Sequence, residues 1–364
     1  MVTLPPPQEP EPPFGRSAHP YFMYEMIWLQ PKAVQATRGT AAAQAPGIPT
    51  PPAGRRILFV GIGTSFHAAL ASAASARILL GPRYPVEAIA SFDIVADPTR
   101  SKDAGSAVVF SQSGETWITV QAQQVLRRQG IPMVLISSAT KSASADLAEH
   151  LLVTQHTIET AWTHTVSYTA AVTAANELLR VWGRAAGADD PAAVDEALST
   201  ALKLEPAVRA FAFEQKDRPE LVLLSSGASE ATVREAALKC REAAGIFAVA
   251  TGIEEFLHGV NPSVSERATV IAVSANELER DRALEALTVA RAVGAATRLV
   301  DSSGGSPLAS IWSLPAVPPE ATALVQIVPL QFFAYYSAVA RGINPDVMRL
   351  DDERYLKARR LFGI

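Results

Sequence analysis

The stretch ILFVGIGTSFHAALASAASARIL, residues 57–79, decides the fold class. It joins a short, wholly apolar run to a loop of small residues and then to an alanine-rich segment. An apolar run without polar alternation is typical of a strand buried on both faces of a parallel sheet. The alanine-rich segment is typical of the helix that covers such a sheet. The stretch therefore predicts a strand–loop–helix unit of an α/β domain.

Four more apolar runs follow, and the segments between them include predicted helices at 67–79 and 116–129. Strands that alternate with helices indicate a doubly wound, flavodoxin-like parallel sheet. The five strands are predicted at 57–61, 85–90, 106–111, 132–137 and 150–154.

The second half of the chain repeats this scheme. Its strands are predicted at 220–225, 245–250, 268–274, 296–302 and 308–314. Serines mark corresponding strand ends in the two halves, always 163 to 165 residues apart. The pairs are Ser65 and Ser229, Ser111 and Ser274, and Ser137 and Ser302. A constant offset predicts a duplicated domain, so the fold class is α/β with two tandem five-stranded domains.

The remaining segments set the predicted domain boundaries. The first 54 residues hold 12 of the 26 prolines and are read as a mobile arm (1–20), a helix from Tyr21 to Ala36 that Pro31 kinks or ends, and a linker from Gly39. Linker helices are expected around 191–213. The predicted divisions are 1–54 (proline-rich arm with its helix), 55–195 (first domain), 196–341 (second domain) and 342–364 (C-terminal tail).

Composition excludes several classes of protein. The chain has 364 residues and a net charge of −4, so a basic nucleic-acid-binding surface is not expected. A single cysteine, Cys240, excludes an intramolecular disulfide and a zinc finger, and fits a cytoplasmic location. The N-terminus lacks the pattern of an export signal. Residues 323–340 are apolar but contain glutamine, proline and tyrosine, so they predict a buried helix, in the core or at a subunit interface, and no membrane span.

Two hydroxyl-rich loops follow the first and third predicted strands, at residues 61–65 and 111–116, and we call them the hydroxyl loops. Small residues and free N–H groups at a helix N-terminus can hold a phosphate, although serine and threonine can also simply cap a helix. Two such loops on adjacent strands favour phosphate binding. The candidate residues are Gly63, Thr64, Ser65, Ser111, Gln112, Ser113, Gly114 and Thr116. The matching loops of the second half contain glutamates, which would repel a phosphate.

These residues carry a resemblance. GTSFHAAL (63–70) and SQSGET (111–116) look like the sugar isomerase (SIS) domain, and the tandem arrangement resembles the isomerase half of glucosamine-6-phosphate synthase. Segments 23–31, 235–242, 255–259 and 327–331 are similar to further motifs of that family. The resemblance covers nearly the whole chain after about residue 20. It includes no glutaminase half, so no internal route from glutamine to ammonia is expected.

Lys239 and Glu242 lie three residues apart on one predicted helical face, with Glu235 one turn earlier. By themselves they predict a solvated ion pair. The resemblance implies instead that Glu242 moves a proton between C1 and C2 of an open-chain sugar, with Lys239 beside it. A carboxylate suits this step because it can reach two adjacent carbons from one position.

The resemblance also implies that His258 opens the sugar ring and comes from the neighbouring subunit of a homodimer. Histidine can give and take a proton near neutral pH. Thr165 and Glu255 become possible substrate contacts. No metal and no cofactor are implied, because the histidines do not show a ligand spacing. The aromatic residues Phe332, Phe333, Tyr335 and Tyr336 are a second reason to expect a homodimer.

Two departures from the family matter. In the segment WTHTVSYT (162–169), Val166 replaces the family's lysine and His164 replaces a serine. In the tail, Glu353 stands where the synthase has a Schiff-base lysine, and the nearby Lys357 looks solvated. A Schiff-base lysine needs a lowered pKa, so a covalent imine step is not expected.

Together these features predict a phosphosugar aldose–ketose isomerase that acts on an amino-sugar phosphate. The expected reaction interconverts glucosamine 6-phosphate and fructose 6-phosphate, by deamination or by amination. The alternatives are a deglycase of 6-phosphofructosyl amino acids, of the fructoselysine 6-phosphate type, and a non-catalytic phosphosugar sensor. The sensor is disfavoured because no helix-turn-helix segment is recognisable and both Glu242 and His258 are present. The expected partners are a small sugar phosphate and a second copy of the chain.

Overall fold

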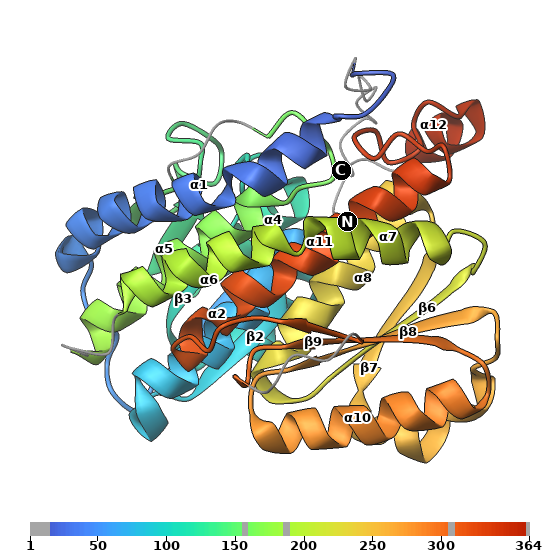
Figure 1. Ribbon diagram of the computed structural model, residues 1–364. Coiled ribbons are helices and arrows are strands. Elements are labelled where there is room, and N and C mark those ends of the chain that lie inside the picture. Colours follow the sequence, from blue (N-terminus) through green and yellow to red (C-terminus); the bar gives the residue numbers. More distant parts are fainter. Residues whose placement is uncertain (1–14, 155–158, 185–189, 305–309, 362–364) are drawn as a thin grey trace.

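Two five-stranded parallel sheets form the framework of the computed structural model, which describes residues 15–154, 159–184, 190–304 and 310–361. Helices cover both faces of each sheet (Figure 1). All ten predicted strands are present, so the prediction of two tandem α/β units with five strands each is confirmed.

The first sheet has the strand order β2-β1-β3-β4-β5. Alternate residues of β1 face opposite cores: Ile57 and Phe59 pack toward α2 and α5, whereas Leu58 and Val60 pack toward α3 and α4. This two-sided burial explains why the strand shows no polar alternation. The strands are β1 Arg56–Gly61, β2 Val86–Ala90, β3 Ala104–Phe110, β4 Met133–Ser137 and β5 His150–Val153. The helices are α2 Thr64–Leu79, α3 Ser91–Ala96, α4 Trp117–Arg128 and α5 Val166–Gly183.

The second sheet has the order β10-β9-β8-β6-β7, which is the same connectivity as in the first. This agreement confirms the predicted duplication. The strands are β6 Glu220–Ser225, β7 Phe247–Gly252, β8 Ala268–Ser274, β9 Ala296–Asp301 and β10 Ile311–Ser313. The helices are α8 Glu230–Ala244, α9 Ile253–Glu255, α10 Glu277–Ala292 and α11 Thr322–Ala340.

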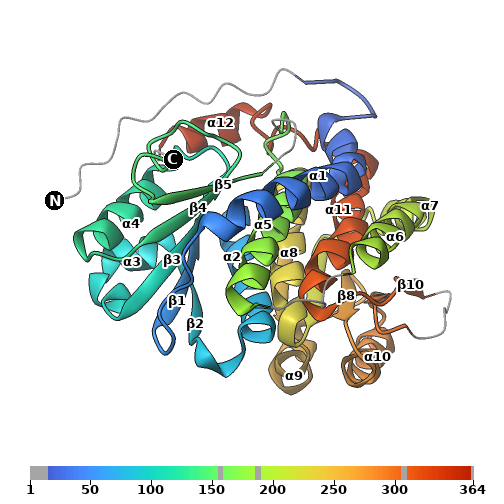
Figure 2. The ribbon, with the colours of Figure 1, turned by 90° about the vertical axis from the view of Figure 1, so that its left-hand side faces the viewer.

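One hydrophobic core joins the two sheets. Phe59 of β1 and Leu223 of β6 belong to the same buried cluster, which runs through α2, α5, α8 and α11. Figure 2 shows α2, α5 and α8 between the sheets. The first turn of α2 and the whole of α8 therefore lie at the junction of the two halves.

Helix α1 runs from Phe22 to Gln44 and continues past Pro31. The prediction that the helix ends at Pro31 or shortly after it, at Ala36, is therefore wrong. A proline leaves the carbonyl four residues earlier without its helical donor. The Gln30 side chain fills this role, because its Nε2 donates to the Ile27 carbonyl (3.1 Å) and also to Gln331 Oε1 (2.8 Å). The linker expected from Gly39 consequently begins after Gln44.

The expected mobile arm begins in residues 1–14, which lie outside the described residues. Its last part lies on the body of the protein, where His19 Nδ1 is 2.7 Å from the Tyr335 hydroxyl. The predicted linker helices are confirmed as α6 Pro191–Lys203 and α7 Glu205–Glu214, and the tail carries α12 Glu353–Arg359. The exact domain boundaries stay predictions.

Helix α11 is a core helix, as predicted. In the described part of the chain, the stretch Pro319–Ala340 has the length and composition of a membrane span, yet 89% of its most apolar window is buried inside the protein. Its aromatic side chains are at most 2% exposed within a single chain: Phe332, Phe333, Tyr335 and Tyr336. They therefore need no partner subunit, which corrects the use of these residues as an argument for a homodimer.

Candidate active site

The first hydroxyl loop connects β1 to α2. Gly63 precedes the helix with a φ of 58°, a conformation that glycine adopts without steric cost. Its carbonyl accepts the N–H groups of Phe66 and His67, which starts the first turn. This backbone places the side chains of Thr64 and Ser65 at the helix N-terminus, where the helix dipole favours an anion.

The second hydroxyl loop connects β3 to α4. Gly114 has a φ of 71°, and a Cβ atom added to it would lie 2.0 Å from Ser142 Oγ. Ser111 is buried and its hydroxyl accepts the Gly114 N–H at 3.2 Å. The loop is therefore shaped by Ser111 and Gly114, while Gln112, Ser113 and Thr116 face the adjoining pocket.

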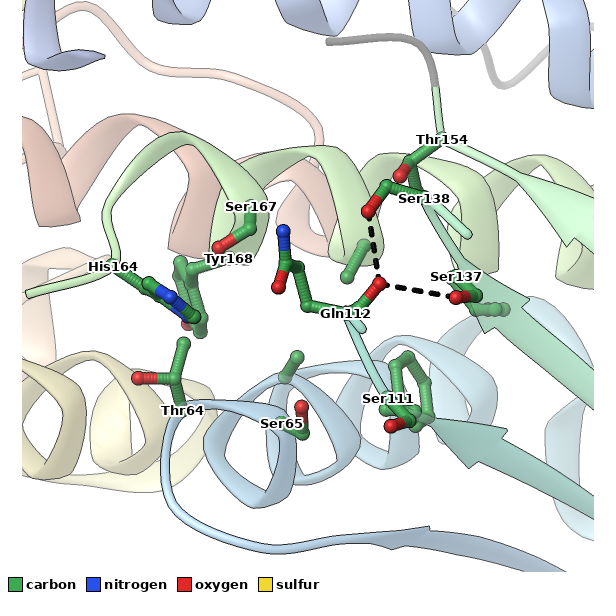
Figure 3. Close-up of a pocket in the computed structure, with 14 residues that line it drawn as sticks. Thr64, Ser65, Ser111, Gln112, Ser137, Ser138, Thr154, His164, Ser167 and Tyr168 are labelled. Carbon is green, nitrogen blue, oxygen red and sulfur yellow. Dashed lines mark hydrogen bonds between the residues drawn. The ribbon is translucent and has the colours of Figure 1, made fainter. Parts of the chain in front are cut away.

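A small cavity beside these loops shows how they are held (Figure 3). The backbone carbonyl of Gln112 accepts hydrogen bonds from the hydroxyls of Ser137 (3.1 Å), the last residue of β4, and Ser138 (2.8 Å), the residue after it. Thr64 and Ser65 line the same cavity from the other loop. The two hydroxyl loops thus converge on one place, as expected for adjacent strands of one sheet.

Helix α8 brings charged residues of the second half to this place. Lys239 Nζ donates to Glu242 Oε2 (2.6 Å) and to Thr64 Oγ1 (2.9 Å), and lies 3.4 Å from Glu235 Oε1. Glu235 in turn accepts from Thr64 Oγ1 (3.2 Å) and lies 2.7 Å from His67 Nδ1. We call Thr64, His67, Glu235, Lys239 and Glu242 the buried ion network.

The buried ion network is not the solvated ion pair that the spacing alone predicts. The side chains of Lys239 and Glu235 are 1% and 0% exposed, whereas that of Glu242 is 15% exposed. Burial by itself lowers the pKa of Lys239, but the carboxylates of Glu235 and Glu242 outweigh it and raise the pKa. Lys239 is therefore an ammonium that holds Glu242 in place at the edge of the pocket.

An open pocket of ≈ 700 Å³ lies over both halves of the site. Hydroxyl-loop residues form one side and Lys239 with Glu242 forms another. Its lining also includes residues that the sequence did not indicate. These are Ile62, Phe92, Val95, Trp117, Ile118, Trp162, His164, Met348 and Arg359.

Thr165 lies outside this pocket lining. It is fully buried, and its hydroxyl donates to Glu159 Oε1 at 2.9 Å. Glu159 also accepts the N–H groups of Thr165, Val166 and Ser167, so it caps the N-terminus of α5. Burial would raise the pKa of Glu159, but His164 and the donors from Ser167 and Thr165 prevail and lower it. Thr165 thus contributes to the helix cap, next to the pocket-lining His164.

His258 and Glu255 lie at the other end of the second sheet. Glu242 precedes β7 and His258 follows it, and six residues of strand span about 20 Å. The His258 side chain is 76% exposed, with Nε2 3.4 Å from Glu254 Oε2. Glu255 accepts from the Thr251 hydroxyl (2.8 Å). Within one chain, His258 therefore cannot contact Glu242.

The C-terminal tail reaches the pocket through residues other than the predicted ones. Lys357 is exposed and pairs with Glu353 at 2.9 Å on the same helix. Two residues later, Arg359 lines the pocket, and its guanidinium carbon lies 5.7 Å from the centre of the Trp162 ring. Arg359 lies about half a helical turn after Lys357, so it projects from the opposite face of the same helix. This spacing was the feature of the sequence that could have indicated it.

His67 is the other residue that the sequence reasoning missed. It stands four residues after Gly63, so it lies one helical turn into α2 on the loop-facing side, which was the available signal. In the described ranges, no three His, Cys, Asp or Glu side chains gather as a metal-ligand group.

Comparison with known proteins agrees with this architecture. The model of the SIS domain matches residues 53–178 and 215–341. This chain is 28% identical to the glutamine–fructose-6-phosphate aminotransferases (isomerizing) of Thermococcus kodakarensis and Pyrobaculum aerophilum, and each match covers 92% of this chain. The chain spans only 58% and 57% of their lengths.

Solved structures share the fold. The C-terminal domain of glucosamine-fructose-6-phosphate aminotransferase from Francisella tularensis superposes with a TM-score of 0.78 at 20% identity, over 89% of this chain and 97% of that one. Glucosamine-6-phosphate deaminase from Thermotoga maritima gives 0.72 at 20% identity, over 89% and 96%.

Proposed function

The chain belongs to the SIS-domain family, and from this premise we propose that it is a phosphosugar isomerase whose substrate carries nitrogen beside its carbonyl carbon. Its simplest substrate is glucosamine 6-phosphate, interconverted with fructose 6-phosphate and ammonia. One observation carries the proposal: Glu242, held by the buried Lys239, lines the same pocket as both hydroxyl loops.

In this proposal the hydroxyl loops bind the substrate phosphate. Gly63, Thr64 and Ser65 offer backbone N–H groups at the start of α2, and Ser65 also offers its hydroxyl, whereas the Thr64 hydroxyl donates to Glu235. The second loop contributes the remaining donors. They are Gln112, Ser113 and Thr116, which face the pocket, in a loop whose shape depends on the hydrogen bond between Ser111 and Gly114. Neutral dipoles at a helix N-terminus hold a phosphate without a metal.

Glu242 carries the chemistry in this proposal. Its carboxylate removes a proton from one of the two carbons C1 and C2 and returns it to the other. Lys239 fixes the carboxylate by its 2.6 Å hydrogen bond, and Glu235 fixes Lys239 from the buried side. The 15% exposure of Glu242 is compatible with contact to a bound substrate.

Ring opening is proposed for His258 of a second copy in a homodimer, since His258 and Glu242 of one chain lie at opposite ends of β7. Glu255, three residues earlier, would contact substrate there. Mixing tests this. Glu242→Gln and His258→Asn should each be inactive. Mixing them in equal amounts should restore about a quarter of the activity, because half the dimers then hold one intact site out of two. No regain would refute the shared site.

The central experiment incubates the protein with glucosamine 6-phosphate and follows ammonia and fructose 6-phosphate. Turnover is expected in the native chain. It is also expected in the control variant Glu353→Gln, which removes an exposed carboxylate of the tail. Glu242→Gln should lose at least a hundredfold in rate while still being stabilised against heat by the sugar phosphate. Equal rates in Glu242→Gln and the native chain would refute the assignment of the proton carrier.

A second candidate is removal of the sugar from 6-phosphofructosyl amino acids. It is favoured by the exposed position of Lys357, which leaves the pocket without the tail lysine that a Schiff base to fructose 6-phosphate would need. Release of glucose 6-phosphate from 6-phosphofructosyl-lysine tests it. A cytoplasmic location also stays a prediction.

A further inference from the structure

Seven of the residues that line the pocket are apolar or aromatic. We call this group the aromatic wall, and it consists of Ile62, Phe92, Val95, Trp117, Ile118, Trp162 and Met348. Phe92 and Ile62 are 58% and 40% exposed. Leaving such large apolar groups in water is unfavourable by roughly 25 cal/mol for each Å² that could be buried. The wall therefore indicates that something apolar covers it.

A sugar phosphate by itself does not match this wall. Hydroxyl groups surround a hexose, and they lose hydrogen bonds to water when they face an apolar surface. The pocket volume of ≈ 700 Å³ lies well within the range of about 300–1,000 Å³ that encloses drug-sized ligands. Within one chain, before the His258 of a second copy enters the site, there is consequently room beside the sugar for a second, apolar group.

Arg359 adds a positive charge beside Trp162. It lines the pocket together with Trp162, over whose ring its guanidinium lies at 5.7 Å. A guanidinium binds a carboxylate with two parallel hydrogen bonds, and an aromatic ring beneath it keeps it in plane. The pocket thus offers three kinds of recognition: phosphate donors, a cation and an aromatic surface.

We propose that the nitrogen of the substrate belongs to an apolar or aromatic amino acid, whose side chain packs on the aromatic wall and whose carboxylate binds Arg359. The phosphosugar part occupies the hydroxyl loops, so the substrate is a 6-phosphofructosyl adduct of that amino acid. This inference rests on the proposed function and narrows its substrate class.

The reaction balances without an oxidant or reductant. Glu242 moves a proton from C1 of the ketoamine to C2, and the proton of the substrate N–H passes through water to the C2 oxygen, so that the C2 ketone becomes a hydroxyl and the C1–N bond becomes an imine. Water then adds to C1, the C1–N bond breaks, and the nitrogen leaves with a proton as the free amino acid. The products are glucose 6-phosphate and the amino acid.

The test compares three substrates by release of glucose 6-phosphate: the 6-phosphofructosyl adducts of phenylalanine, glycine and benzylamine. The phenylalanine adduct should exceed the glycine adduct in kcat/KM by about tenfold or more, since an apolar pocket discriminates to that extent. Phe92→Ala and Trp117→Ala should each reduce this ratio severalfold. Phe213→Ala, which removes a partly exposed ring of α7 outside the pocket lining, should leave the ratio unchanged.

Benzylamine lacks the carboxylate, so its adduct isolates the part of Arg359. Arg359→Gln should lower kcat/KM for the phenylalanine adduct and leave that for the benzylamine adduct nearly unchanged. If the native chain treats the glycine and phenylalanine adducts alike, the inference is wrong. The inference is also wrong if Phe92→Ala changes the oligomeric mass of the protein in solution but not the ratio of kcat/KM between the adducts. The aromatic wall would then be covered by a second copy of the chain.

The failure of this inference and that of the proposed function are distinguishable. Turnover of glucosamine 6-phosphate with no preference among the adducts overturns the inference alone. Failure of glucosamine 6-phosphate and of all three adducts, both in turnover and in stabilisation against heat, overturns the proposed function as well.

Discussion

Replacing Lys239 with methionine removes an ammonium from the interior while keeping a side chain of similar length. Lys239 contacts three groups: Glu242 (2.6 Å), Thr64 (2.9 Å) and Glu235 (3.4 Å). Because Thr64 belongs to the first half of the chain and the two glutamates to the second, the change disturbs the junction of the halves. We expect a large loss of stability.

The magnitude follows from what remains behind. Breaking a buried ion pair on one side costs about 3–5 kcal/mol, since the other charge stays buried without compensation. Glu235 is 0% exposed but keeps its contacts to His67 and Thr64, and the partly exposed Glu242 can regain water. Because of these contacts we expect the loss in free energy of unfolding to lie near the lower end of this range, at about 3 kcal/mol. For a chain of 364 residues that unfolds as one unit, that corresponds to a fall in melting temperature of roughly 4 °C.

Thermal unfolding followed by circular dichroism measures this effect. Lys357→Met is the matched control, because Lys357 also pairs with a glutamate on its own helix but is exposed. Exposed pairs contribute little, so its melting temperature should stay close to the native value. The double variant Glu235→Gln/Lys239→Met should be less destabilised than the sum of the two single changes, by about 1–2 kcal/mol.

A loss in Lys239→Met no larger than in Lys357→Met would refute the reasoning. It would mean that water reaches Lys239 in solution and that the buried ion network does not add to the stability of the junction between the two halves. Additive effects in the double variant would refute the pairing of Lys239 with Glu235.

Three further outcomes are expected. Gly114→Ala should weaken sugar-phosphate binding and stability, because its Cβ meets Ser142; adding Ser142→Gly should recover only part, since the positive φ remains. Cys240, whose pKa burial raises to about 12, should resist iodoacetamide at pH 8 until the protein is unfolded; fast alkylation of native protein would contradict this. Glu159, whose pKa is lowered on folding, should stabilise the protein above its ordinary pKa of about 4.5 and lose that contribution as the pH falls from there through the lowered value. Glu159→Gln should therefore flatten the fall of the melting temperature below about pH 4.5.

The place of the hydroxyl loops could be predicted because it depends on neighbouring residues in the chain. Residues 61–65 and 111–116 each follow a strand and start a helix, and parallel strands bring such loops to one edge of the sheet. Reasoning from neighbouring residues also explains the prediction that failed, namely that helix α1 ends near Pro31. Pro31 signals a break by its own chemistry, but the Gln30 side chain, one residue away, supplies the missing hydrogen bond.

The buried state of Lys239 could not be predicted, because spacing on a helix is the same for a solvated pair and for a buried one. Only the packing of α8 against α2 removes water from it and brings Thr64 and His67 into contact. The aromatic wall could not be predicted from the sequence for a similar reason. Phe92, Trp117, Trp162 and Met348 come from four separate segments, and each looks like ordinary core or surface residue in its own segment.

The sequence by itself determined the two tandem parallel sheets, the duplicated connectivity and the place of the hydroxyl loops, because these follow from local runs of apolar residues and from the residues that start helices. Tertiary structure decided which charges are buried, which tail residue reaches the pocket, and that His258 lies about one strand length from Glu242 in the same chain. Those features depend on contacts between segments far apart in sequence, and no local pattern encodes the distance between them.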